Sequence, residues 1–200
     1  MVKWLYNHSE GELEMKKIIA LILVVVCALC VFAGCEKTET DENGNVITVK
    51  GDKTTVEIAS LPFEFEYDGM QITWMSTEFV KEFSAGYYTP KTISTFYVKD
   101  AVDNDINGMI ESIRHQQEED RGIKIVGGAE DGDGTYHWDI RTRCEMVSAD
   151  NPGDALLVVT TSMYKEVKED TTGGVYIYIT NDDGTKTTYL LDNLELSNNE

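Results

Sequence analysis

The stretch FEFEYDGMQITW, from Phe63 to Trp74, decides how this chain folds. Aromatic and acidic side chains alternate up to Asp68, and an alternation with period two is typical of a strand that buries one face. The alternation resumes after Gly69, with apolar residues at every second position. Because Asp-Gly between two such runs favours a tight turn, the stretch predicts a β-hairpin.

Further strands are predicted where β-branched and aromatic residues gather or alternate with polar ones. They lie at 92–98, 123–126, 136–141, 155–161, 175–180 and 187–191. The run 155–161 is apolar on both faces, as expected of a central strand. Two short runs, 46–49 and 55–58, are either strands around a turn or the edge of a spacer.

Two helices are predicted between these strands. The first begins at Ser76, a good N-cap, and ends at Gly86. Its apolar face comprises Phe79, Val80 and Phe83. The second begins after Asp103 or Asn104 and is expected to stop near Asp120. Its apolar stripe at helical spacing comprises Ile106, Met109, Ile110 and Ile113.

Runs of strands with two helices among them indicate an α+β fold, an antiparallel β-sheet with two helices packed on one face. We assign this single domain to residues 61–200, a length that can bury a core and fold alone. The preceding residues 36–45 are polar and nearly free of apolar side chains. They therefore predict a flexible tether.

The segment that starts at Met15, MKKIIALILVVVCALCVFAGC, has the layout of an export signal. Two lysines precede an uncharged apolar run, and small residues stand before Cys35. The last four residues, Phe32-Ala33-Gly34-Cys35, resemble the lipobox of bacterial lipoproteins, although leucine is more usual than Phe32 at its position. The resemblance implies that Cys35 receives a diacylglyceryl group and becomes the N-terminus of the mature protein.

This resemblance divides the chain into a signal peptide (15–34), a lipidated cysteine with a polar tether (35–60) and the domain. Residues 1–14 are interpreted as a mis-annotated extension before a true start at Met15. An uncleaved membrane anchor is the alternative, but the apolar run is shorter than the roughly 20 residues that a spanning helix needs. Because two acyl chains hold a protein firmly in a bilayer, we expect a lipoprotein on the extracytoplasmic face of the cell membrane.

The charge and the cysteines restrict the partners. The chain carries 36 acidic and 17 basic residues, a net charge of −19. Such a charge argues against binding nucleic acid or lying on anionic lipid. After the leader and Cys35 only Cys144 remains, so the mature domain has no internal disulfide, which fits a Gram-positive surface. The expected partners are the lipid bilayer, through acylated Cys35, and an envelope protein or glycan.

The acidic loop 127–135 is the one candidate metal site. Its carboxylates Glu130, Asp131 and Asp133 alternate with glycines, as at the start of a calcium loop. The later ligands of such a loop are missing after Thr135. The sequence therefore favours a solvated hairpin loop, and it predicts neither a metal nor a cofactor.

No motif predicts catalysis. His115 and His137 stand outside any zinc motif and are interpreted as surface residues. The carboxylates of Glu64, Glu66 and Asp68 share one strand face, which is interpreted as solvated. If Val175, Ile177 and Ile179 face the core, the tyrosines between them face outward.

Tyr176 and Tyr178 are therefore the binding candidates, since exposed aromatic rings suit sugar or peptide contacts. We expect a non-enzymatic binding module. The alternative is a carbohydrate-active or other envelope enzyme accessory.

Overall fold

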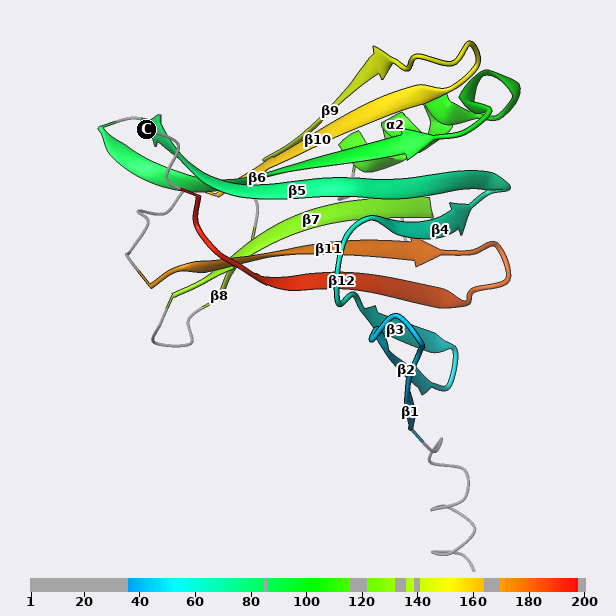
Figure 1. The fold of residues 1–200 in the computed structure, drawn as a ribbon, viewed down its shortest axis with the longest axis horizontal. Helices are drawn as coiled ribbons and strands as arrows, with labels where there is room; N and C mark the ends of the chain where they lie inside the picture. Colours follow the sequence, from blue (N-terminus) through cyan, green and yellow to red (C-terminus); the bar gives the residue numbers. More distant parts are fainter. Residues whose placement is uncertain are drawn as a thin grey trace, which may run out of the picture. The chain divides into compact units, whose positions relative to one another are not determined.

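Two β-sheets build the part of the chain that the structure describes (Figure 1). In this computed structural model the described residues are 36–84, 86–115, 122–131, 136–138, 141–163 and 170–197. Strands dominate, and these residues contain a single α-helix. The predicted α+β class, with two helices on one face of a sheet, is therefore wrong, and the fold is β-rich.

The two sheets have seven and five strands. The seven-stranded sheet has the order β1 (Lys37–Thr40), β2 (Val46–Lys50), β3 (Lys53–Glu57), β12 (Lys186–Leu194), β11 (Thr172–Thr180), β7 (Gly122–Glu130) and β8 (Tyr136–Trp138). The five-stranded sheet has the order β4 (Phe63–Tyr67), β5 (Met70–Ser84), β6 (Tyr87–Val98), β10 (Ala155–Ser162) and β9 (Arg141–Ser148).

The hairpin predicted around Asp68-Gly69 is confirmed. β4 and β5 pair in antiparallel register, with Tyr67 opposite Met70. The two turn residues have φ angles of 49° and 75°. Positive φ at both central positions is the requirement of a type I′ turn, whose twist matches that of the flanking strands.

The first predicted helix, after Ser76, is wrong, because these residues form the second half of β5. A β-bulge between Trp74 and Ser76 shifts the register against β6. The inward-facing positions therefore change from even to odd numbers, which brings Phe79 into the core. Val80 is also buried, and it forms a bridge with Ser197 near the end of the chain. The spacing of Phe79 and Val80 resembles that of a helix, but the bulge accounts for the burial of Phe79 and the bridge with Ser197 for that of Val80.

Two glycines stand where the sheets approach each other closely. A Cβ atom on Gly127 would lie 1.8 Å from the hydroxyl oxygen of Thr161, and one on Gly173 would lie 2.5 Å from the ring of Phe79. A larger residue at either position would force the Thr161 side chain or the Phe79 ring to shift, so the close approach favours glycine at both. The residues from Gly127 to Glu130, predicted to lie in the acidic loop, instead belong to β7.

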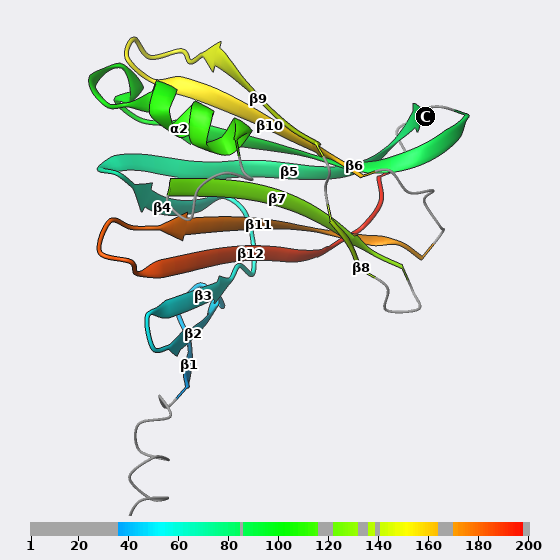
Figure 2. The ribbon, with the colours of Figure 1, turned by 180° about the vertical axis from the view of Figure 1, so that it is seen from behind.

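The second predicted helix is confirmed as α2 (Ile106–Arg114), with its whole apolar stripe buried, but its cap is neither Asp103 nor Asn104 and it ends before the predicted limit near Asp120. Its N-cap is Asp105, whose carboxylate accepts a hydrogen bond of 2.9 Å from the N–H of Gly108. The helix contributes to a core that both sheets share. It contacts β7 of one sheet and β9 of the other, so it closes the gap between the sheets along one side (Figure 2).

The N-terminal strands extend the seven-stranded sheet. The runs that the sequence left open form β2 and β3, and β3 pairs in parallel with β12. Cys35 and the leader before it lie outside the described residues. Within the described ranges, no helix has both the length and the apolar character needed to cross a membrane.

Candidate functional site

The C-terminal half of α2 satisfies backbone groups at the edges of both sheets. The Ser112 hydroxyl donates to the carbonyl oxygen of Ile123 at 3.0 Å and accepts from its N–H at 3.1 Å. This part of β7 has no strand partner on that side, because β8 begins to pair only at Gly128. Arg114 Nη2 donates to the carbonyl oxygen of Cys144 in β9 at 3.0 Å. Unpaired edge groups invite another strand, so this end of the helix closes the β7 edge at Ile123 but covers only one carbonyl of the β9 edge.

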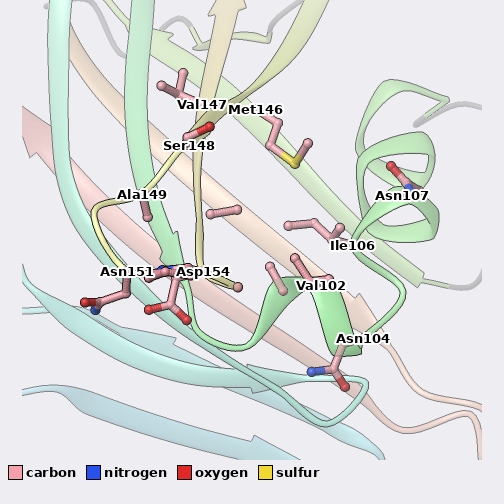
Figure 3. Close-up of a pocket in the computed structure, with 14 residues that line it drawn as sticks. Val102, Asn104, Ile106, Asn107, Met146, Val147, Ser148, Ala149, Asn151 and Asp154 are labelled. Atoms are coloured by element: carbon pink, nitrogen blue, oxygen red, sulfur yellow. The ribbon is translucent and has the colours of Figure 1, made fainter.

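At the other end of α2, the space beside β9 forms a groove of about 500 Å³ (Figure 3). Its walls are the start of α2, the short 3₁₀ helix η1 (Ala101–Asp103), the end of β9 and the β9–β10 loop. The side chains of Val102, Ile106 and Met146 point into this space from different walls. The volume lies within the range of roughly 300–1,000 Å³ that is typical of ligand sites.

The groove gathers exposed apolar side chains. Val102 is 77% exposed, Met146 55% and Val147 49%, and all three line it. Surface apolar groups concentrated at one place, with polar groups around them, mark interaction sites. The polar groups here are the amides of Asn104, Asn107 and Asn151, the hydroxyl of Ser148 and the carboxylate of Asp154.

Hydrogen bonds hold one wall of the groove in place. Tyr97 donates its hydroxyl proton to Asp154, which also accepts the N–H of Asp100 at 2.8 Å. Asn151 Nδ2 donates to the Tyr97 hydroxyl at 3.1 Å. The Tyr97 bond is the main cause that holds the pKa of Asp154 below its ordinary value, and the same carboxylate raises the pKa of Tyr97. The β9–β10 loop is thereby tied to the end of β6.

The end of β9 presents unpaired backbone groups to the groove. β9 is an edge strand that pairs only with β10. Successive residues of such a strand direct their N–H and C=O to opposite sides. Because the Cys144 carbonyl points toward α2, those of Met146 and Ser148 point to the same side. Among the described residues, no hydrogen bond reaches them there.

The predicted binding candidates lie elsewhere, on the outer face of the seven-stranded sheet. Tyr176 and Tyr178 are half-buried, and their stacked rings have centroids 6.2 Å apart. Trp138 of β8 is 49% exposed and contacts Tyr176 at 5.1 Å between ring centroids. Burial raises the pKa of Tyr178. The three rings form what we call the aromatic row, of which the sequence identified only the tyrosines.

The two metal candidates that the structure describes, Asp131 and Glu130, belong to no cluster of possible metal ligands. The Asp131 carboxylate is buried, accepts the Thr171 hydroxyl proton at 3.3 Å and lies 3.2 Å from His137 Nε2. Glu130 is exposed, and Asp133 lies outside the described residues. Among the residues that can be placed, no three His, Cys, Asp or Glu side chains are grouped to hold a metal ion. His137, predicted to be an ordinary surface residue, instead pairs with a buried carboxylate.

The remaining candidates also stay apart. His115 is exposed and bonds to Glu111 of the same helix at 3.0 Å. Glu64 and Glu66 are exposed on β4, whereas Asp68 is a turn residue that lines a separate hollow. Those three acids were predicted to project from one strand face. Cys144 is buried, and burial raises the pKa of its thiol to about 11, so it is a poor nucleophile.

No protein-family model matches the chain, and no curated protein matches its sequence. The assignment of the groove as a candidate site therefore depends on its geometry alone. Sequence reasoning missed it because its walls come from two segments, 101–107 and 146–155, that only the fold brings together. The one available signal was an apolar Val102 and a Met146-Val147 pair beside loops rich in Asn and Asp.

Proposed function

We propose that this chain is a lipid-anchored extracytoplasmic interaction module that binds an extended segment of another envelope protein in the groove beside β9. One observation carries the proposal: the unpaired edge of β9 and several exposed apolar side chains lie together in this groove. The membrane anchor rests on the lipobox-like residues that end at Cys35.

The anchor is tested by intact-mass analysis of the protein purified from its native membrane, beside the Cys35→Ala variant. A chain that begins at Cys35 and carries the mass of added acyl groups supports the anchor, provided that the variant loses that mass. An unmodified chain that retains residues 15–34 contradicts it.

An extended polypeptide is the occupant that this groove favours. A strand laid beside β9 would form backbone hydrogen bonds with Met146 and Ser148, the mode known as β-strand addition. Side chains at alternate positions of that strand would reach the apolar groups of Val102 and Ile106. The Asn107 amide on the opposite wall offers a donor and an acceptor to the far edge of the added strand.

The groove is tested with peptides selected from a random library against the full chain, with affinity measured by fluorescence anisotropy. Met146→Pro removes a groove-facing N–H and should weaken binding by about tenfold or more. Val102→Asp should do the same, because it places a charge in an apolar contact. Val49→Asp changes another exposed valine, on β2, and is the matched control.

Hydrogen exchange completes this test. A bound peptide should slow exchange of the amides of Met146 and Ser148, since both acquire acceptors. Selected peptides that bind Met146→Pro and Val102→Asp as tightly as the wild type, or that leave both amides unprotected, would overturn the proposal. So would a library that yields no binder.

A glycan on the aromatic row is the second candidate, favoured by the half-exposed Trp138 beside Tyr176. Aromatic rings with polar tips suit sugar contacts. Soluble oligosaccharides of cell-wall type should then change the fluorescence of Trp138, and Tyr176→Ala should abolish the change. Tyr88→Ala, an exposed tyrosine on the β5–β6 hairpin, is the control. An unchanged signal in the wild type excludes this candidate.

A further inference from the structure

A second hollow, of about 320 Å³, lies on the five-stranded sheet and is lined by basic side chains. The strand register places Lys91 of β6 and Arg141 of β9 on either side of Ser162 in β10. Two residues further along β9, Arg143 stands opposite Thr160. Since residues two apart on a strand share a face, these side chains converge on one face of the sheet.

The charge of this hollow is opposite to that of the whole chain. Its lining contains Lys91, Arg141 and Arg143 against one carboxylate, that of Glu82. Glu82 Oε1 lies 3.4 Å from Lys91 Nζ, an exposed pair of small energetic weight. Neither arginine forms an ion pair with any residue in the described ranges. In a chain with a net charge of −19, two arginines on one strand face without an acidic partner require a reason.

The hydroxyl groups between these cations suit an oxyanion. Thr160 and Ser162 are half-buried, and their side chains form no hydrogen bond within the described structure. A guanidinium group offers parallel N–H donors that match the oxygens of a carboxylate or a phosphate. Hydroxyl donors beside it would complete the coordination of such a group.

Protection of the sheet edge explains only part of this arrangement. Basic residues on an edge strand discourage pairing with other chains, and Arg141 and Arg143 lie on the edge strand β9. Lys91, however, lies on β6, the middle strand of the sheet. Edge protection accounts neither for this lysine nor for the hollow that the three cations share.

We propose that this hollow binds an oxyanion, a carboxylate or phosphate group of a soluble ligand, through Arg141 and Arg143 with the hydroxyls of Thr160 and Ser162. The site is independent of the groove beside β9. Arg141 and Arg143 supply the charge, and the two hydroxyls between them and Lys91 fix the position of the anion. Glu82 competes with the ligand for Lys91.

The test uses the full chain in detergent and follows the binding of inorganic phosphate and of acetate by calorimetry at constant ionic strength. The double variant Arg141→Gln/Arg143→Gln should weaken binding of the preferred anion by about tenfold or more. Lys53→Gln/Lys124→Gln removes the same charge from the seven-stranded sheet and is the matched control. Its affinity should stay within about twofold of the wild type.

A gain-of-binding variant separates the proposal from simple damage to the fold. Glu82→Gln removes the competing carboxylate and should strengthen anion binding, and Thr160→Val should weaken it. Equal losses in the two double variants would mean that only overall charge matters, which overturns the site. Absence of binding by both anions, or weaker binding in Glu82→Gln, would also overturn it.

A vesicle arm distinguishes a soluble ligand from a lipid headgroup. Binding to phosphatidylglycerol vesicles, but not to phosphatidylcholine vesicles, that depends on Arg141 and Arg143 would reassign the site to the membrane surface and contradict a soluble ligand. Binding of free phosphate or acetate without such vesicle binding supports the proposal.

Discussion

The two sheet edges beside helix α2 are treated differently. At β7, the Ser112 hydroxyl satisfies both backbone groups of Ile123. At β9, Arg114 satisfies only the carbonyl of Cys144, and the edge beyond it borders an apolar groove. Proteins commonly cover or blunt such edges, because an exposed one recruits other strands. The end of β9 is therefore the open edge at which the proposed partner would bind, and the following predictions test whether it is open.

The largest expected difference is in thiol reactivity between two inward positions of β9. Cys144 is buried with a pKa of about 11, whereas Met146 is 55% exposed in the groove. A cysteine in Met146→Cys with an ordinary pKa would hold about a hundredfold more thiolate at pH 8. Maleimide labelling, mapped by mass spectrometry, should therefore modify that cysteine at least this much faster. Comparable labelling rates at the two cysteines would show that the end of β9 is covered rather than open.

Proline substitutions on β9 should separate its two sides. Glu145 directs its N–H toward β10, so Glu145→Pro leaves a carbonyl of β10 unsatisfied and should cost roughly 1–3 kcal/mol of unfolding free energy. Met146→Pro removes only a groove-facing N–H and should cost under about 1 kcal/mol. Urea unfolding followed by circular dichroism measures both. Equal costs would refute the orientation assigned to the strand.

Substitutions on α2 compare its closed and open ends directly. Ser112→Ala leaves the N–H and C=O of Ile123 without their partner and should lower the unfolding free energy by roughly 1–3 kcal/mol. Asn107→Ala, which lines the groove, should change it by no more than about 0.5 kcal/mol. The same urea titration applies. A larger loss at Asn107 would mean that the groove is part of the stabilising core.

The smallest effect is expected from the carboxylate at the groove wall. The pKa of Asp154 is lowered in the folded state by Tyr97 and by the N–H of Asp100. The pKa of an aspartate in the unfolded chain is about 3.9. Because the pKa of Asp154 is lower in the folded protein, its ionised carboxylate stabilises the fold at pH values above about 3.9. This stabilisation is lost as the pH falls through the pKa of the folded state.

Asp154→Asn should therefore lose less stability than the wild type between pH 5 and about pH 3. Thermal unfolding across that range measures the difference. Asp150→Asn, in the same loop, is the control. If Asp154→Asn loses as much stability in acid as the wild type, the Asp154 carboxylate does not stabilise this wall of the groove.

Local patterns predicted those elements whose stabilising contacts are near in sequence. The Asp68-Gly69 hairpin, the apolar stripe of α2 and the alternation around Tyr176 follow from turn chemistry and periodicity, and each is observed. The second half of β5 was predicted as a helix because the bulge after Trp74 and the bridge from Ser197 cannot be read locally.

The candidate sites divide in the same way. The aromatic row was half predicted, since Tyr176 and Tyr178 are close in sequence while Trp138 comes from another strand. The groove and the basic hollow were not predicted, because strand pairing places Arg141 beside Ser162, and Ser162 beside Lys91. No sequence window contains these neighbours.

The sequence by itself determined most of the strand-forming segments, the tight turns, helix α2 and the acidic charge, and it predicts an export signal with a lipobox-like end at Cys35. These depend on side-chain size, backbone preference and charge over a few neighbouring residues. The tertiary structure decided that the strands divide into two sheets, that Gly127 and Gly173 let the sheets approach, and that α2 closes one edge only. Those outcomes depend on contacts between distant segments, whose energies exist only once the chain has folded.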